Sequence, residues 1–311
     1  MKILIPNTID LPVTADVEAV VYDIDAEIPD EHRDAEVLVV WHNSSSWLQE
    51  AARTLPELRL VQALASGADA VLNAGFPEEV RICSGRSLHD GPVAEHALAL
   101  ILGAVRRLDR LRDAQLEHRW DDDFNEVQSA PESRGSYTLD AARVTIWGFG
   151  SIASTLAPLL TALGAEVQGI ARSTGTRSGY PVHADADAAT VLSETDVLVS
   201  ILPATDATAG LFDSTVFDAM RAGSVFVNVG RGTTVDEGAL IAALESGRLR
   251  AAAIDVTRTE PLPASDPLWE APNLLITPHV AGNRPAGAAR LIDANVARLA
   301  AGDDLVNQVR P

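Results

Sequence analysis

Apolar, strand-like runs alternate with helix-like segments along nearly the whole chain of 311 residues. In the first hundred residues the strand-like runs are KILI (2–5), AVVYD (19–23), EVLVVW (36–41), RLVQAL (59–64) and RICS (81–84). A second series stands at 143–147, 166–171, 196–202, 224–229, 251–256 and 274–277. This alternation predicts an α/β protein built on parallel sheets.

The length and the two series of strands indicate two domains. A helix-like pattern from Pro92 to Leu116 lies between the series, with Pro92 well placed in a first helical turn, and we expect the domain boundary near residue 95. The polar segment 117–139 predicts irregular surface structure, and the alanine-rich pattern 286–300 predicts a last helix.

Charge and cysteine content exclude several classes of protein. A formal net charge of −20 argues against a nucleic-acid-binding protein and against docking on anionic membranes. The apolar run 97–105 is too short to span a bilayer, and the first ten residues lack the pattern of a signal peptide. The single cysteine, Cys83, rules out an intrachain disulfide and suits a reducing cytoplasm. We expect it to be buried.

The stretch VTIWGFGSIAS (144–154) fits the dinucleotide-binding pattern G-x-G-x-x-G/A with Gly148, Gly150 and Ala153. The first glycine allows a tight turn, the second lets the backbone approach a pyrophosphate, and the alanine keeps the helix close to the strand. A purely structural turn is the alternative interpretation. Pro158 falls inside the expected helix and should kink it beyond its first turn.

The end of the second strand indicates which dinucleotide is bound. NAD-binding units place an acidic residue there to bind the ribose 2′-hydroxyl. This chain has Ala171 at that position, followed by Arg172, with Arg177 nearby. Because a guanidinium can grip a 2′-phosphate, Arg172 favours NADP(H), with NAD still possible; a solvated loop arginine is the alternative.

Three segments carry polar residues at predicted strand ends, where open α/β sheets bind ligands. They are VNVGRGTTVDEGAL (227–240), AIDVTRTEPL (253–262) and ITPHVAG (276–282). Together with the glycine turn, GPVAEHALALIL (91–102) and SILPAT (200–205), they resemble the D-isomer-specific 2-hydroxyacid dehydrogenases. The arginine after the second strand is most similar to the glyoxylate/hydroxypyruvate reductase branch.

The resemblance implies two Rossmann-like domains with parallel sheets. Residues 1–95 with 286–311 would form a flavodoxin-like substrate domain, and residues 96–285 the NAD(P)-binding domain. It also implies a homodimer built on the cofactor domain, without indicating the contact face.

The family's catalytic residues fall on Arg231, Glu260 and His279. Reduction of a 2-oxo acid needs a fixed cation that binds the substrate carboxylate, and an arginine can bind it with two parallel hydrogen bonds. It also needs a proton donor beside the carbonyl oxygen, a role that suits histidine near neutral pH. Glu260 would orient the imidazole and favour its protonated form.

Further positions carry over by the same resemblance. Asp255 resembles the residue that holds the nicotinamide carboxamide. The other expected cofactor-binding residues are Gly148, Phe149, Gly150, Ser151, Ile152, Arg172, Ser173, Leu202, Pro203, Val229 and Gly230. Ser66, Gly67 and Ala68 resemble the loop that binds the substrate carboxylate together with Arg231. We expect Asp236 to cap a helix. We assign no metal, because His118 beside DDD (121–123) has no second histidine or cysteine near it.

These observations favour an NADPH-preferring reductase of small 2-oxo acids such as glyoxylate or hydroxypyruvate. One alternative is the same fold acting on a bulkier 2-oxo acid, on formate or on phosphite. Formate is disfavoured, because those relatives carry glutamine where this chain has Glu260. A non-catalytic dinucleotide-sensing interaction module is the alternative from another class.

Overall fold

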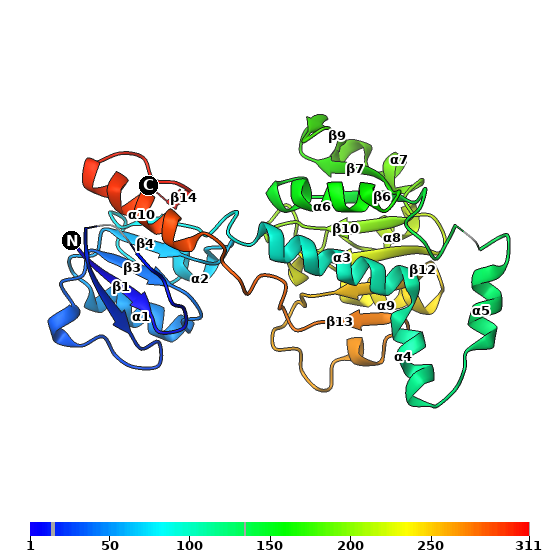
Figure 1. Ribbon diagram of the computed structural model, residues 1–311, viewed down its shortest axis with the longest axis horizontal. Coiled ribbons are helices and arrows are strands. Elements are labelled where there is room, and N and C mark those ends of the chain that lie inside the picture. The colour runs from blue at the N-terminus through cyan, green and yellow to red at the C-terminus, as the bar shows by residue number, and fades with distance from the viewer. Residues whose placement is uncertain (14–15, 134, 311) are drawn as a thin grey trace. The chain divides into compact units, whose positions relative to one another are not determined.

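The computed structural model describes residues 1–13, 16–133 and 135–310 (Figure 1). It consists of two compact units. Unit 1 comprises Met1–His89 and Gly282–Pro311, and unit 2 comprises Asp90–Ala281. The chain therefore leaves unit 1 once and returns to it once.

Unit 1 is built on one sheet with the strand order β2-β1-β3-β4-β5-β14. The strands are β1 (Lys2–Pro6), β2 (Glu18–Tyr22), β3 (Val37–Val40), β4 (Leu60–Ala63), β5 (Arg81–Cys83) and β14 (Gln308–Arg310). The first five are parallel in the flavodoxin-like order 2-1-3-4-5, and β14 is antiparallel to β5. The expected flavodoxin-like sheet is confirmed, with an added antiparallel edge.

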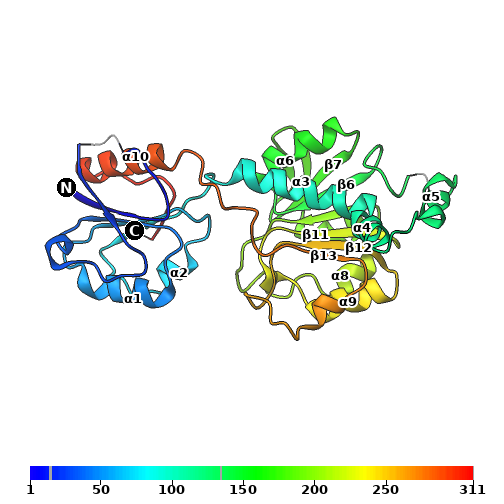
Figure 2. The same cartoon turned by 60° about the horizontal axis from the view of Figure 1, so that its bottom comes forward.

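Helices cover both faces of this sheet (Figure 2). Leu38, Val61 and Ile82 pack against α1 (Ser45–Thr54) and α2 (Asp69–Leu72). Ile3, Val39 and Leu60 face the opposite side, where α10 (Ala288–Ala301) packs. Because side chains alternate along a strand, strands buried on both faces need the nearly continuous apolar runs seen in the sequence. A short 3₁₀ helix, η1 (Asp30–His32), lies between β2 and β3.

Unit 2 contains a second sheet with the order β13-β12-β11-β10-β6-β7-β9-β8. Its strands are β6 (Arg143–Trp147), β7 (Glu166–Ala171), β8 (Gly175–Arg177), β9 (Tyr180–Ala184), β10 (Val197–Ser200), β11 (Ser224–Asn228), β12 (Leu249–Ile254) and β13 (Leu274–Ile276). All pairs are parallel except β8 with β9. Apart from β8, the order is the 3-2-1-4-5-6 arrangement of dinucleotide-binding domains extended by one strand.

The helices of unit 2 also cover both faces of their sheet. On one face α3 (Asp90–Arg106) and α6 (Ser151–Ala162) pack on Val144, Ile146 and Val199. On the other face Leu198, Phe226 and Ile254 contact the helical side chains of α7 (Ala188–Leu192), α8 (Ser214–Ala219) and α9 (Glu237–Glu245). The remaining elements are α4 (Leu108–Leu116), α5 (Asp122–Ser129), η2 (Asp185–Asp187), η3 (Gly232–Thr234) and η4 (Pro267–Glu270).

Two expectations from the sequence were wrong. The helical pattern 92–116 is two helices, because Arg107 adopts a left-handed conformation with φ 54° between α3 and α4. The segment 117–139 is not irregular throughout, because α5 forms inside it with Asp121 as its N-cap. Helix α6 runs through Pro158 to Ala162. Among the described residues, no helix combines the length and the apolar character needed to cross a membrane.

Candidate active site

The glycine turn of unit 2 leaves the start of α6 open. Gly148 has φ +101°, and a Cβ there would lie 2.7 Å from the carbonyl oxygen of Ile201, so only glycine fits. Gly150 is the N-cap of α6 and no side chain caps the helix. A Cβ on Gly150 would meet no heavy atom within 4 Å. An uncapped helix N-terminus facing open space fits a pyrophosphate.

The loops around this turn come from neighbouring strands. Strand β10 pairs with β6, so Leu202 and Pro203, which follow β10, lie beside the turn at the point where the strand order reverses. Val229 and Gly230 follow β11, and a Cβ on Gly230 would lie 2.6 Å from the Leu202 carbonyl oxygen. Phe149 is buried, and its ring packs where a side chain on Gly169 would stand, so Phe149 has only its backbone to offer a ligand.

The loop after β7 carries the arginines that sequence analysis singled out. Arg172 and Ser173 are exposed, and within the described ranges no carboxylate pairs with Arg172. Arg177, on β8, donates from Nη1 to the Phe149 carbonyl (3.1 Å) and from Nη2 to Ser173 Oγ (3.3 Å). The hairpin β8–β9 therefore ties this loop to the glycine turn, a contact that the sequence did not predict.

Glu260 and His279 come together on the loops that follow β12 and β13, two neighbouring strands. Glu260 Oε2 accepts a hydrogen bond from His279 Nδ1 at 2.7 Å, and Glu260 Oε1 accepts one from the Thr257 amide at 3.1 Å. The imidazole is about half exposed, with 48% of its side chain accessible. Because Nδ1 is engaged, Nε2 is the ring nitrogen left to meet a ligand.

Arg231 follows β11, which is adjacent to β12. Its Nη1 donates to the Gly230 carbonyl at 2.8 Å, and its own carbonyl accepts from Asn228 Nδ2 and Thr234 Oγ1. A Cβ on Gly232 would overlap the carbonyl carbon of Thr257, so the Arg231 loop and the loop that leads to Glu260 are in backbone contact. In the part of the chain that the structure describes, no carboxylate forms an ion pair with Arg231.

Asp255 is buried against the loop that carries His279. Its side chain is 1% exposed, and its carboxylate accepts hydrogen bonds from the amides of Val280 and Ala281. Its expected contact with the nicotinamide carboxamide stays a prediction. Asp236 caps α9 by accepting from the Ala239 amide, as the sequence predicted.

Ser66, Gly67 and Ala68 belong to unit 1 and form the loop between β4 and α2. Ser66 is exposed and Ala68 is buried. In the same unit His89 is 2% exposed, lies 2.8 Å from the Leu64 carbonyl through Nε2 and stacks on Trp41. It is a core residue of unit 1.

Cys83 is fully buried in β5, as expected, and burial raises the pKa of its thiol to about 12. It therefore has no thiolate with which to act as a nucleophile near neutral pH. In the described ranges no group of three or more His, Cys, Asp or Glu residues is placed to hold a metal ion.

Comparison with known proteins gives a consistent family. Residues 98–281 match the family model described as D-isomer specific 2-hydroxyacid dehydrogenase, NAD binding domain. The chain is 31% identical over 290 residues to the glyoxylate/hydroxypyruvate reductase A of Citrobacter koseri, covering 90% of this chain and 88% of that protein. It is 32% identical over 283 residues to the enzyme of the same name from Serratia proteamaculans, covering 88% and 86%.

Solved structures share the fold over nearly the whole chain. A D-isomer specific 2-hydroxyacid dehydrogenase from Xanthobacter autotrophicus Py2, in complex with NADPH and MES, aligns with a TM-score of 0.79 and 27% identity, covering 99% of this chain and 97% of that one. An NADPH-dependent glyoxylate/hydroxypyruvate reductase from Sinorhizobium meliloti, in complex with NADP and sulfate, aligns with a TM-score of 0.79, 26% identity and the same coverage.

Proposed function

This chain belongs to the D-isomer specific 2-hydroxyacid dehydrogenase family, and from that premise we propose that it reduces small 2-oxo acids, such as glyoxylate and hydroxypyruvate, with NADPH as the preferred cofactor. In this proposal unit 2 binds the dinucleotide and unit 1 contributes the substrate loop Ser66–Ala68.

The observation that carries the proposal is the 2.7 Å hydrogen bond between His279 Nδ1 and Glu260 Oε2, on the strand-end loops next to that of Arg231. The carboxylate fixes the ring and keeps a proton on Nδ1, so Nε2 is left to hold the proton that the carbonyl oxygen receives. Arg231, without a carboxylate partner among the described residues, is available to grip the substrate carboxylate. A bound nicotinamide dinucleotide supplies the hydride.

The preference for NADP is supported by the loop after β7. No acidic residue ends this strand, and Arg172 and Ser173 are exposed beside Arg177. An acidic residue there would repel a 2′-phosphate, whereas a guanidinium binds it. The NADPH and NADP complexes of the two similar structures agree with this proposal.

The test is to follow the absorbance of NADPH with a panel of 2-oxo acids of increasing size, and to repeat each measurement with NADH. We expect the highest kcat/KM with glyoxylate or hydroxypyruvate, and a clear advantage for NADPH. A maximum at a branched or aromatic 2-oxo acid would favour the bulkier-substrate alternative. Tight NADPH binding without turnover of any acid would favour the dinucleotide-sensing module.

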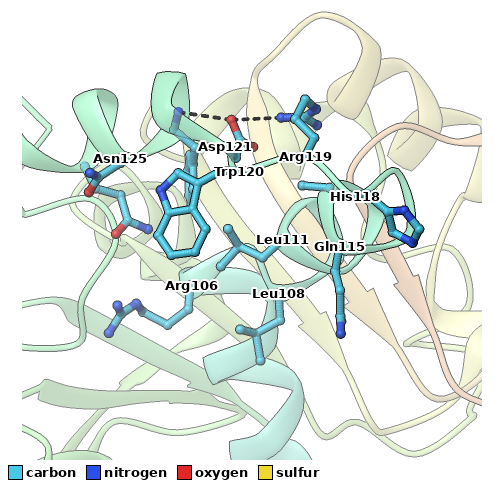
Figure 3. Close-up of a pocket in the computed structure, with 12 residues that line it drawn as sticks. Arg106, Leu108, Leu111, Gln115, His118, Arg119, Trp120, Asp121 and Asn125 are labelled. Atoms are coloured by element: carbon cyan, nitrogen blue, oxygen red, sulfur yellow. Dashed lines mark hydrogen bonds and ion pairs between the residues drawn. The ribbon is translucent and has the colours of Figure 1, made fainter.

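We also propose that the protein is a cytoplasmic homodimer. The single buried cysteine supports the location. The dimer is supported by a groove of about 830 Å³ in unit 2, lined by Leu108 and Leu111 of α4 and by Trp120 (Figure 3). Trp120 is 85% exposed. Such an exposed apolar surface on a globular domain marks an interaction site.

Charge on this groove favours a second copy as its partner. Residues 106–119 hold five arginines against three carboxylates in a chain that is otherwise strongly acidic, and residues 121–126 hold four carboxylates. Within one copy Arg110 and Arg119 already pair with Asp121, and Arg107 pairs with Asp109. A twofold interface can therefore set Arg106 and Arg112 of one copy against the other carboxylates of segment 121–126 in the second copy.

A further inference from the structure

We propose that His96 is a positioning residue for His279, acting through Thr277 and Asp255. The inference rests on the proposed function in one respect only, which is that His279 is the proton donor. The hydrogen bonds that carry it all lie within unit 2.

Asp255 binds three consecutive amides of the loop that carries His279. Its carbonyl accepts from the His279 amide (2.8 Å), Oδ1 accepts from the Val280 amide (3.0 Å), and Oδ2 accepts from the Ala281 amide (3.0 Å). His279 itself has φ +52°, in the left-handed region that few residues with a side chain adopt. Such a backbone persists only where its surroundings stabilise it. Here Asp255 accepts from all three amides, and the Thr277 carbonyl also accepts from the His279 amide at 3.1 Å.

The Asp255 carboxylate needs further donors because it is 1% exposed. Thr277 Oγ1 donates to Asp255 Oδ1 at 2.6 Å. His96 reaches the same pair from α3, with Nε2 at 3.0 Å from Thr277 Oγ1 and 3.2 Å from Asp255 Oδ1. The only hydroxyl proton of Thr277 is already given to Asp255, so His96 Nε2 must carry a proton and donate it.

His96 therefore connects a long packed helix to the loop that holds His279. Without its Nε2–H, the Thr277 hydroxyl oxygen and the buried carboxylate of Asp255 both lose a donor. The left-handed backbone at His279 then has weaker support, so the imidazole is expected to sample positions away from the reacting carbonyl. Displacement of this kind lowers the rate of the chemical step more than the affinity for the cofactor.

The test compares His96→Leu, which removes the donor, with His96→Gln, whose amide places an N–H near the former Nε2. His183→Leu is the matched control, because His183 is also half-buried and has Nε2 3.2 Å from a side-chain oxygen, Gln168 Oε1, at the other end of the sheet. Two readouts are used, namely kcat with KM for NADPH, and the ¹⁵N imidazole resonances of His279, which are identified by their loss in His279→Ala.

We expect His96→Leu to lower kcat about 10- to 100-fold and to raise the KM for NADPH by a smaller factor, because the predicted contact of Asp255 with the nicotinamide carboxamide depends on the same carboxylate. It should also shift or broaden the His279 resonances. His96→Gln should recover most of both, and His183→Leu should change neither. If His96→Leu does not fold, Thr277→Val removes the hydroxyl between His96 and Asp255 and leaves only the direct contact of His96 Nε2 with Asp255 Oδ1. It should move the His279 resonances in the same direction.

The inference is overturned if the His279 resonances stay in place in His96→Leu or Thr277→Val, or if His96→Gln is no better than His96→Leu. Equal loss of kcat in His96→Leu and His183→Leu would also overturn it, because the effect would then be general destabilisation. Failure of the wild-type protein to reduce any 2-oxo acid would refute the proposed function instead, and the resonances, which need no substrate, would still decide the role of His96.

Discussion

At the scale of single residues, the hydrogen bond from His279 Nδ1 to Glu260 leads to a sharp prediction. Replacing His279 with alanine removes the proposed proton donor, and we expect kcat to fall by about 10²- to 10⁴-fold, the usual contribution of a general acid. The affinity for NADPH, measured by fluorescence titration, should stay nearly unchanged. Substantial residual reduction in this variant would mean that another acid protonates the substrate.

Arg172 tests the cofactor preference at the same scale. It is exposed on the loop after β7, and its guanidinium is proposed to bind the 2′-phosphate. We expect Arg172→Ala to weaken NADPH binding by about 10- to 100-fold, the value of a charge-assisted hydrogen bond, and to leave NADH binding nearly unchanged. Dissociation constants for both cofactors decide the matter. Arg53→Ala, an exposed arginine of unit 1, is the control. Equal losses for NADPH and NADH would remove the basis for the NADP assignment.

At the scale of elements, most parallel strands could be predicted because they are apolar runs, in most cases buried, with turn residues beyond them. Strand β9, which is parallel to β7, is an exception because it buries only Val182. The hairpin β8–β9 could not, because Gly175, Thr176 and Arg177 form an edge strand with no apolar signal. Helix α5 buries only Phe124, and the guanidinium carbon of Arg110 lies 4.7 Å from the centre of that ring. A helix with one buried side chain has no apolar stripe in its sequence by which it could be predicted. The break at Arg107 depends on hydrogen bonds to Asp109 and to Asn273, which is distant in the sequence.

The candidate site shows the same division. Polar residues at strand ends predicted where Arg231, Glu260 and His279 would lie, because parallel strands present their carboxyl ends at one edge. The contact between the Arg231 loop and Thr257 involves backbone atoms of two segments about 25 residues apart, and no side-chain pattern encodes it. Nothing in the sequence around His96 distinguishes it from other residues of its helix. Its contact with Thr277 depends on how α3 packs against the loop after β13, so it could not be predicted.

Gly232 is where this loop contact can be tested. A Cβ there would overlap the Thr257 carbonyl group, so Gly232→Ala must push apart the loops that carry Arg231 and Glu260. We expect a loss of about 1–3 kcal/mol in the free energy of unfolding, together with a raised KM for the 2-oxo acid, because Arg231 moves. Gly91→Ala is the control, since a Cβ on Gly91 meets no atom within 4 Å. Wild-type stability and KM in Gly232→Ala would show that the loops separate freely.

At the scale of the whole molecule, net charge opposes the association of two copies, whereas exposed apolar surface favours it. Two copies of a chain with a net charge of −20 repel one another, so association needs a surface that offsets this repulsion. The groove of α4 and α5 combines exposed apolar side chains with the basic segment 106–119. A charge placed in this groove should therefore disrupt the proposed dimer more than a charge placed at an exposed leucine elsewhere on the molecule.

Two leucines of similar exposure, one inside the groove and one outside it, test whether the proposed dimer forms through the groove. Leu111 is 39% exposed in the groove, and Leu159 is 41% exposed on α6, so a glutamate costs each site a similar amount in the isolated fold. We expect Leu111→Glu to convert the dimer to a monomer in light scattering, because a carboxylate in an apolar contact must lose its hydration when the contact forms. Leu159→Glu should remain dimeric. The thermal midpoint should rise with protein concentration for the wild type and for Leu159→Glu, and be independent of concentration for Leu111→Glu, because only an associating fold gains stability by mass action. A Leu111→Glu variant that is still dimeric would place the interface elsewhere on the molecule.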